Sequence, residues 1–268
     1  MKLETIRRWA PWLGLVVVFA IATSLLSWWQ FSRREEKVLK IDLVIANYDA
    51  EAVDLSEIQW SFDAVGNPIN EWRSVRVTGH YLSDQVLLVR NRPLSGSAGF
   101  LQLVPFELVS GEILMVERGW LRAGSDITKP ESNPLPDQSN RDLVVRLRPS
   151  EPDYGKGEVP GQVASINLGA MREKISPNVI SQFYGRLVSE NPASSELPVA
   201  LPKPSLDEGN HLSYALQWLL FGIMAFAAFI WAYRNDRRMQ LEAKGLLKPK
   251  QKRQTQADLD AVFEDQSQ

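Results

Sequence analysis

The chain has 268 residues, of which 44% are hydrophobic, with 30 basic and 32 acidic side chains, two histidines and no cysteine. The missing cysteines exclude disulfides, cysteine nucleophiles and thiolate metal sites, and two histidines are too few for a metal cage built of histidines alone. A net charge of −2 gives no support for a nucleic-acid partner, and the length allows one or two domains.

The first element is an uncharged run at residues 9–32, rich in apolar residues and with tryptophans near both ends. About 20 apolar helical residues cross a hydrocarbon core of about 30 Å, and tryptophans favour the interface, so the run predicts a transmembrane helix. A second interpretation is a cleaved signal peptide, with residues Ala20 to Ala22 as the cleavage box. The apolar stretch continues past that box as far as Trp29, which favours a span.

The middle of the chain, residues 33–211, predicts a β-rich α+β domain. Residues 33–56 are expected to be helix or coil, residues 129–140 a proline-rich loop and residues 192–204 an extended linker. Two short turns, Ser83-Asp84 and Ser110-Gly111, predict hairpins, and Asn167 is expected to cap a short helix over 167–175. Runs enriched in β-branched and aromatic residues predict strands at 73–81, where the apolar residues alternate, and at 85–89, 100–108, 112–121 and 141–147. Residues 179–188 fit strand or helix, and strand is favoured.

A second uncharged apolar run at residues 212–233 predicts another transmembrane helix, and a basic segment follows it from Arg234 to Arg253. The positive-inside rule then places the C-terminus in the cytoplasm, and with two spans residues 1–8 lie there too. Residues 234–268, basic and then acidic, are expected to form a disordered tail that contacts membrane lipids. The predicted fold class is therefore a multi-pass membrane protein of the cell (inner or plasma) membrane, with an extracytoplasmic domain between two helices. Two buried helices of a soluble protein are the alternative.

Motifs typical of enzymes are missing from the sequence. There is no Walker loop, GxSxG elbow, HExxH or GxGxxG pattern, and the acidic residues are scattered. We therefore expect a protein that is not an enzyme. A membrane-anchored enzyme that relies on one acid of the middle domain is the rival interpretation.

The most chemically distinctive segment begins the second run. On a helix, His211, Tyr214, Trp218 and Gly222 share one face. A neutral imidazole at a membrane edge is a suitable ligand for haem iron, and aromatic rings suit the walls of a haem site. The alternative is an interfacial histidine with an aromatic belt and no ligand. Gln217 is polar inside a span, so it is expected to face a neighbouring helix or a ligand.

Further candidate contacts lie in two other places. Trp29, Gln30 and Arg33 cluster at the end of the first run, where Trp29 and Arg33 are four residues apart and can stack; an anchor belt is the alternative. In the domain, Arg92 and Arg118 follow strands and suit a carboxylate such as a haem propionate, with Trp120 beside them; internal salt bridges are the alternative. His80, the other histidine, is expected to be structural or at the surface.

Three sequence blocks together resemble one known family. The first is LSWWQFSRREEK at 26–37, with Ser27 where the family pattern has glycine. The second is the ordered set in the domain that includes Gly79 and VERGW at 116–120, and the third is NHLSYALQW at 210–218. Because the three blocks occur in this order and two predicted spans enclose the domain, the chain resembles the Surfeit locus protein 1 family of cytochrome c oxidase assembly factors.

The resemblance implies a non-enzymatic role in the maturation of cytochrome c oxidase. Members of the family promote maturation of subunit I by handling or presenting haem A that comes from haem A synthase. The implied partners are therefore cytochrome c oxidase subunit I, haem A synthase and membrane lipids, with haem A as a transient cofactor. His211 is the residue implied as the haem iron ligand. A scaffold that stabilises an oxidase intermediate without touching haem is the alternative, and a eukaryotic source would imply the mitochondrial inner membrane.

Overall fold

The computed structural model describes residues 3–63, 66–155, 157 and 159–248. Two compact units share the chain: residues up to 35 together with those from 209 onwards, and residues 36–208. The disorder predicted for the tail from residue 234 is wrong for residues 234–243, which are helical. The acidic end of that tail lies outside the described residues, so its expected disorder stays a prediction.

The first unit consists of two long helices, α1 (Leu3–Asn47), whose last turns belong to the second unit, and α3 (His211–Ala243). Each contains a window with a mean hydropathy near 2, at 2.0 and 1.9, which is long and apolar enough to cross a membrane. Only 11% of each window is buried, so neither helix is the core of a soluble domain. Both predicted runs lie inside these helices. The polar segment after the first run continues as helix to Asn47.

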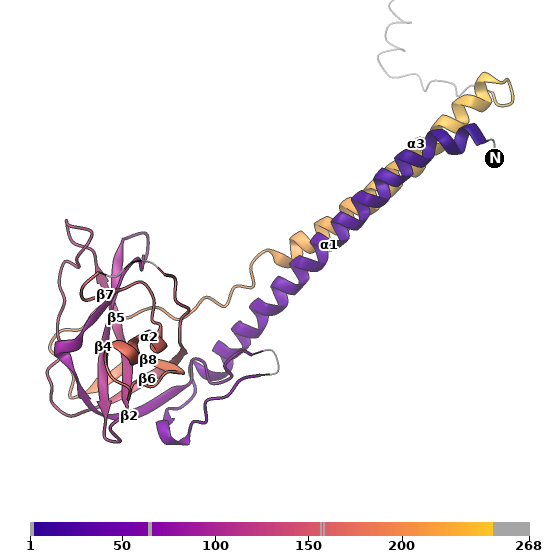
Figure 1. Cartoon of the computed structure of the whole chain (residues 1–268). Helices are drawn as coiled ribbons and strands as arrows, with labels where there is room; N and C mark the ends of the chain where they lie inside the picture. The colour runs from indigo at the N-terminus through magenta and orange to yellow at the C-terminus, as the bar shows by residue number, and fades with distance from the viewer. Residues whose placement is uncertain (1–2, 64–65, 156, 158, 249–268) are drawn as a thin grey trace, which may run out of the picture. The chain divides into compact units, whose positions relative to one another are not determined.

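α1 and α3 lie side by side and antiparallel (Figure 1). Their less exposed residues recur at alternating spacings of three and four, which is the pattern of a coiled-coil seam. At one end, Arg8 and the Trp9 indole both contact the Asp236 carboxylate. The seam includes Thr23, Ser27 and Gln30 on α1 and His211, Ala215, Trp218 and Gly222 on α3.

The second unit is built on an eight-stranded sheet in the order β1-β2-β6-β8-β5-β4-β3-β7, and an additional β2–β4 pairing closes five strands into a barrel (Figure 1). The ring runs β2, β6, β8, β5, β4 and back to β2. All its pairings are antiparallel except β5 with β8. The strands are β1 (Val53–Asp54), β2 (Ser74–Tyr81), β3 (Leu87–Val89), β4 (Gly99–Leu108), β5 (Ile113–Arg122), β6 (Arg141–Pro149), β7 (Gln162–Val163) and β8 (Phe183–Asn191).

Both faces of the central strands are buried. On β5, Leu114 and Val116 join a core cluster drawn from all five barrel strands, which fills the barrel interior. Ile113 and Met115 point to the opposite face, because side chains alternate along a strand. There they pack with the short helix α2 (Leu168–Lys174). A strand buried on both faces explains the nearly continuous apolar sequence of β5.

The end of α1 is attached to the barrel within the second unit. The Asn47 side-chain amide donates to the backbone oxygens of Ile69 and Glu71, both at 2.9 Å. The Tyr48 and Trp72 rings pack with a centroid separation of 5.7 Å, and the Arg146 guanidinium lies 3.7 Å from the Tyr48 ring centroid. These contacts explain why helix continues beyond the apolar run.

The hairpin predicted at Ser83-Asp84 is wrong. β2 and β3 do not pair with each other; both pair with β4, which meets β2 at Phe106 to Leu108 and β3 at Leu101 to Leu103. After β2 the chain therefore stays beside β4 and forms β3 there. A 3-10 turn (η2, Ser83–Gln85) lies between the two strands. Ser83 anchors that turn by donating to the backbone oxygen of Pro136 at 2.6 Å.

Other expectations are confirmed with shifted bounds. β4 and β5 form the predicted hairpin, in which Gly111 adopts a φ of +85° that favours glycine. The Asn167 side chain accepts from the backbone of Ala170 at 2.9 Å and caps α2 as expected. The last strand, β8, begins at Phe183, four residues after the start of the strand predicted at 179–188. The expected linker at 192–204 pairs with the sheet through Val199 and Trp120.

Candidate functional site

The two sequence blocks that carry the resemblance meet between α1 and α3. His211 Nδ1 lies 2.9 Å from the Gln30 Oε1 atom, although the two residues are 181 positions apart. Sequence reasoning placed Gln30 with Trp29 and Arg33 and gave it no link to His211. No local signal reveals this pair, because it depends on the register of the two helices.

Small and hydroxyl-bearing residues set that register. The Ser27 hydroxyl donates to the backbone oxygen of Ala215 at 2.9 Å, one helical turn from the Gln30–His211 contact. A β-carbon at Gly222 would lie 3.0 Å from the Thr23 hydroxyl oxygen, so glycine permits the close approach of the helices. Interhelical hydrogen bonds and small residues are the usual means of packing helices in an apolar environment.

The second imidazole nitrogen of His211 is available. Among the described residues, His211 makes its side-chain hydrogen bond to Gln30 alone, so Nε2 has no protein partner. A β-carbon at Gly209 would lie 3.9 Å from Nε2, and Gly209 adopts a φ of +74° that favours glycine. The backbone before α3 thus leaves one side of the imidazole uncovered.

The other α3 candidates divide between two faces. Trp218 lies in the seam, partly buried, and its ring packs edge-on against Phe221 with centroids 5.8 Å apart. Tyr214 is 51% exposed, and Gln217 is exposed as well. In the described part of the chain neither side chain has a hydrogen-bond partner, so Gln217 does not face α1. The roles of Tyr214, Gln217 and Trp218 around a ligand stay predictions.

At the same end of α1, the Arg33 guanidinium carbon lies 5.9 Å from the Trp29 ring centroid, which is the predicted stacking. Trp29 is half exposed. A cation and an aromatic ring are therefore displayed within one helical turn of Gln30.

The structure pairs the two domain arginines with internal carboxylates, the alternative that the sequence left open. Arg92 pairs with Glu151, and the Trp120 indole donates to the Arg92 backbone oxygen at 2.6 Å. Arg118 is fully buried and lies 3.6 Å from Glu190. A β-bulge causes this burial: Gln102 pairs with Gly119 and Leu103 with Glu117, so the intervening Arg118 is the extra residue.

Around Arg118 lies a buried polar cluster that sequence reasoning missed. Arg141 Nη1 is 3.2 Å from Glu190 Oε1, and the Tyr81 hydroxyl donates to Glu190 Oε2 at 3.0 Å. Burial raises the pKa of the Tyr81 hydroxyl far above its ordinary value, so it stays a donor. The exposed Asp137 contacts Arg141 from outside at 2.6 Å. Charged residues on otherwise apolar strands were the feature of the sequence from which this buried cluster could have been predicted.

Acid should weaken this cluster. Burial of Glu190 favours the neutral acid, but hydrogen bonds from Ser194 and the Arg118 charge outweigh it and hold the pKa of Glu190 below its ordinary value of 4.5. A lowered native pKa stabilises the fold above the unfolded-state value, and that stability is lost as the pH falls through the native value. We expect the free energy of unfolding to fall from about pH 4.5 downwards; denaturant titrations of the full chain and of Glu190→Gln check it. An equally steep acid dependence in Glu190→Gln would contradict this assignment.

His80, the remaining histidine, pairs at the domain surface with Glu107 at 3.3 Å, as expected. Within the described residues no group of three or more His, Asp or Glu side chains is placed to hold a metal ion.

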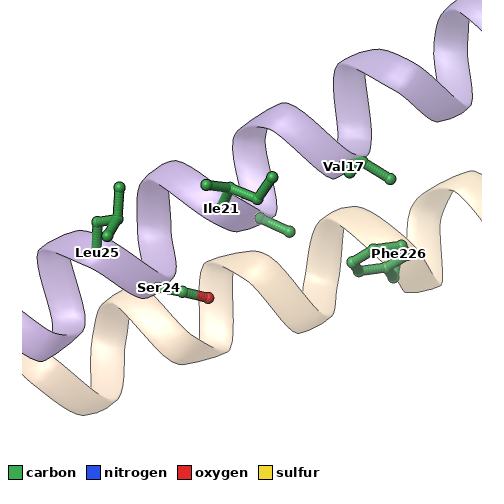
Figure 2. A pocket seen from close by; sticks show the side chains of 6 residues that line it. Val17, Ile21, Ser24, Leu25 and Phe226 are labelled. Atoms are coloured by element: carbon green, nitrogen blue, oxygen red, sulfur yellow. The ribbon is translucent and has the colours of Figure 1, made fainter.

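An open apolar groove of about 410 Å³ lies elsewhere on the helix pair (Figure 2). It is lined on α1 by Val17, Ile21, Ser24 and Leu25, and on α3 by Phe226. Fifteen residues separate Phe226 from His211, which corresponds to about 22 Å of helix rise. The groove is thus distinct from the site at His211.

Comparison with known proteins gives a consistent result. The model of the SURF1 family matches residues 17–223, a range that contains both Gln30 and His211. A SURF1-like protein of Mycobacterium tuberculosis is 31% identical over 245 residues, which cover 87% of this chain and 88% of the relative. A SURF1-like protein of Rickettsia felis is 25% identical over 83% of this chain and 96% of its own length. The cytochrome oxidase assembly protein SHY1 of Saccharomyces cerevisiae is 28% identical over 141 residues, 51% of this chain and 36% of the relative.

Proposed function

Because the chain belongs to the SURF1 family, we propose that it is a membrane-anchored assembly factor for cytochrome oxidase that holds haem A on His211 for delivery to subunit I. The assembly role rests on the family and on the name of the yeast relative. The haem role rests on one observation, the uncovered Nε2 of an imidazole that is held by its other nitrogen.

In this proposal α1 and α3 span the cell membrane and the barrel domain lies outside the cytoplasm. The basic residues after the apolar run of α3, which include Arg234, Arg237 and Arg238 in the last turns of the helix, favour a cytoplasmic C-terminus. With two spans the N-terminus lies on the same side, and haem A synthase and oxidase subunit I are membrane partners of the pair. His211 is the first residue of α3, so in this proposal it lies at the outer membrane surface.

The residues at that position suit a haem. Haem A, when bound, would supply an iron that accepts a nitrogen ligand, and His211 would hold it through Nε2. Trp218 and Phe221 offer aromatic surface on the turns below His211, and Tyr214 and Gln217 offer unpartnered polar groups. The chain's own contribution is to bind, to orient and to release; no acid or nucleophile is required of it.

A scaffold that never binds haem is the second candidate. One observation favours it: Arg92 and Arg118, the domain residues suited to haem carboxylates, are engaged by Glu151 and Glu190. In that case the helix pair and the barrel would stabilise an oxidase intermediate by contact alone.

Purification of the full chain from cells that make haem A separates the two candidates. We expect the absorption spectrum of the preparation to show haem A, and His211→Ala to lose most of it, because the axial ligand is gone. His80→Ala is the matched control, since His80 is the other histidine of the chain and lies at the surface. A haem-free wild-type protein, or full retention of haem by His211→Ala, would favour the scaffold.

The assembly role has its own test. A deletion strain should lose cytochrome oxidase activity and the haem a absorption of its membranes, and the wild-type gene should restore both. Normal oxidase in the deletion strain would contradict the assembly role. Full rescue by His211→Ala would contradict only the haem role.

A further inference from the structure

We infer that Gln30 is a positioning residue for His211: its side-chain oxygen takes the Nδ1 proton as a hydrogen bond and thereby turns a bare Nε2 toward the ligand. The inference rests on the proposed function, because it gives the His211 site its orientation. Its basis is the 2.9 Å contact between Gln30 Oε1 and His211 Nδ1.

The tautomer follows from the acceptor. An amide oxygen only accepts hydrogen bonds, so the imidazole nitrogen facing it must carry the hydrogen. A neutral imidazole carries one hydrogen on its two nitrogens, and Nε2 is then left with its lone pair outward. Hydrogen bonds of this kind fix ring orientation and raise the basicity of metal-binding histidines.

The two partners are held by rigid elements. Gln30 is one turn beyond Ser27, whose hydroxyl bond to the Ala215 backbone fixes the facing turns of α1 and α3. Ser27 and Ala215 are both buried in the seam, so little freedom is left at this register. Gly209 keeps the Nε2 side of the ring open. The pair is therefore preorganised before any ligand arrives.

The first test observes the tautomer directly, without haem. The full chain in detergent micelles, labelled with 15N at histidine, contains only two imidazoles, and His80 serves as the internal reference. Long-range 15N–1H correlation should show that His211 Nδ1 is protonated and Nε2 is bare. Gln30→Leu, which has a similar volume and no acceptor, should lower the population of this tautomer. A protonated Nε2 in the wild type, or an unchanged tautomer in Gln30→Leu, overturns the inference.

The second test measures affinity for added ferric haem A. Loss of such a supporting partner typically weakens metal affinity about 10–100-fold, which is the effect expected of Gln30→Leu. Gln30→Glu keeps the acceptor and should retain affinity, with a lower reduction potential of the bound haem because a carboxylate makes the imidazole more basic. Ser27→Ala removes the neighbouring interhelical hydrogen bond but leaves the Gln30 acceptor in place, so it should weaken haem affinity less than Gln30→Leu does.

The outcomes separate this inference from the proposed function. If His211→Ala binds haem A as tightly as the wild type, the proposed haem role fails. If His211→Ala loses binding while Gln30→Leu binds like the wild type, only the positioning role fails. An equal loss in Gln30→Leu and Gln30→Glu, or in Gln30→Leu and Ser27→Ala, assigns the effect to helix packing and also overturns the inference.

Discussion

Replacing Glu190 by alanine is expected to destabilise the barrel domain by about 3–5 kcal/mol, the usual range when one partner of a buried ion pair is removed. The Glu190 side chain is 1% exposed, and the Arg118 and Arg141 side chains are fully buried. Without the carboxylate, the Arg141 guanidinium keeps the exposed Asp137 and neutral acceptors, and the Arg118 guanidinium keeps neutral acceptors alone. The Tyr81 hydroxyl also loses its acceptor.

Denaturant unfolding of the purified full chain, followed by near-ultraviolet circular dichroism, measures this loss. Glu107→Ala is the control, because Glu107 also pairs with a basic side chain, His80, but at the surface. Surface pairs contribute about 0–1 kcal/mol. Equal destabilisation by the two substitutions would show that the buried cluster is not what holds the barrel strands together.

Gly79→Ala is expected to destabilise the domain by about 3 kcal/mol or more, at or above the upper end of ordinary overpacking. A β-carbon there would lie 2.0 Å from the backbone oxygen of Glu107 and 2.9 Å from the Phe106 ring. The backbone of β4 cannot move aside without breaking the β2–β4 pairing, which closes the barrel.

The matched control is Gly169→Ala in α2, where the new β-carbon would meet its nearest atom at 3.4 Å, an ordinary contact. Alanine favours helix over glycine by up to about 1 kcal/mol, so this variant should be neutral or slightly more stable. Thermal and denaturant unfolding of both variants measure the difference. A Gly79→Ala protein as stable as Gly169→Ala would refute a tight β2–β4 closure.

Local signals were enough to predict much of the fold. The β4–β5 hairpin was found from apolar runs around Ser110-Gly111, and the α2 start from Asn167, because a tight turn and a helix cap depend on neighbouring residues. The two apolar helices were found from their length and lack of charge. β1 and β7, with two residues each, carry too little sequence for a strand pattern.

Features that depend on distant residues were not predictable in the same way. Ser83-Asp84 has a turn composition, yet the direction of the chain after it is decided by β4, which accepts β2 and β3 in succession. Closure of the barrel likewise depends on pairings that no local pattern specifies. An internal salt bridge was one of the two interpretations of Arg118, but its partner Glu190 lies on β8, 72 positions away, and no local pattern identifies it.

At the candidate site, the sequence predicted the right segment and only part of its geometry. The helical face proposed for His211 contained Tyr214, whereas the seam uses Ala215. Both choices fit helical spacing, and the partner helix decides between them, because the Ser27 hydroxyl approaches the backbone at a position where only a small side chain fits.

In the sequence, β8 comes after both of the strands that it pairs with in the barrel, β5 and β6. This order has a consequence for folding. Until β8 is added, β5-β4-β2-β6 is an open antiparallel sheet whose two free edges belong to β5 and β6. Arg118 and Arg141 lie on those edge strands, and like charges there oppose premature edge-to-edge association. When β8 inserts, Glu190 comes between the two arginines and neutralises the repulsion. The strand that closes the ring therefore also carries the carboxylate that balances the charges of the two strands it joins.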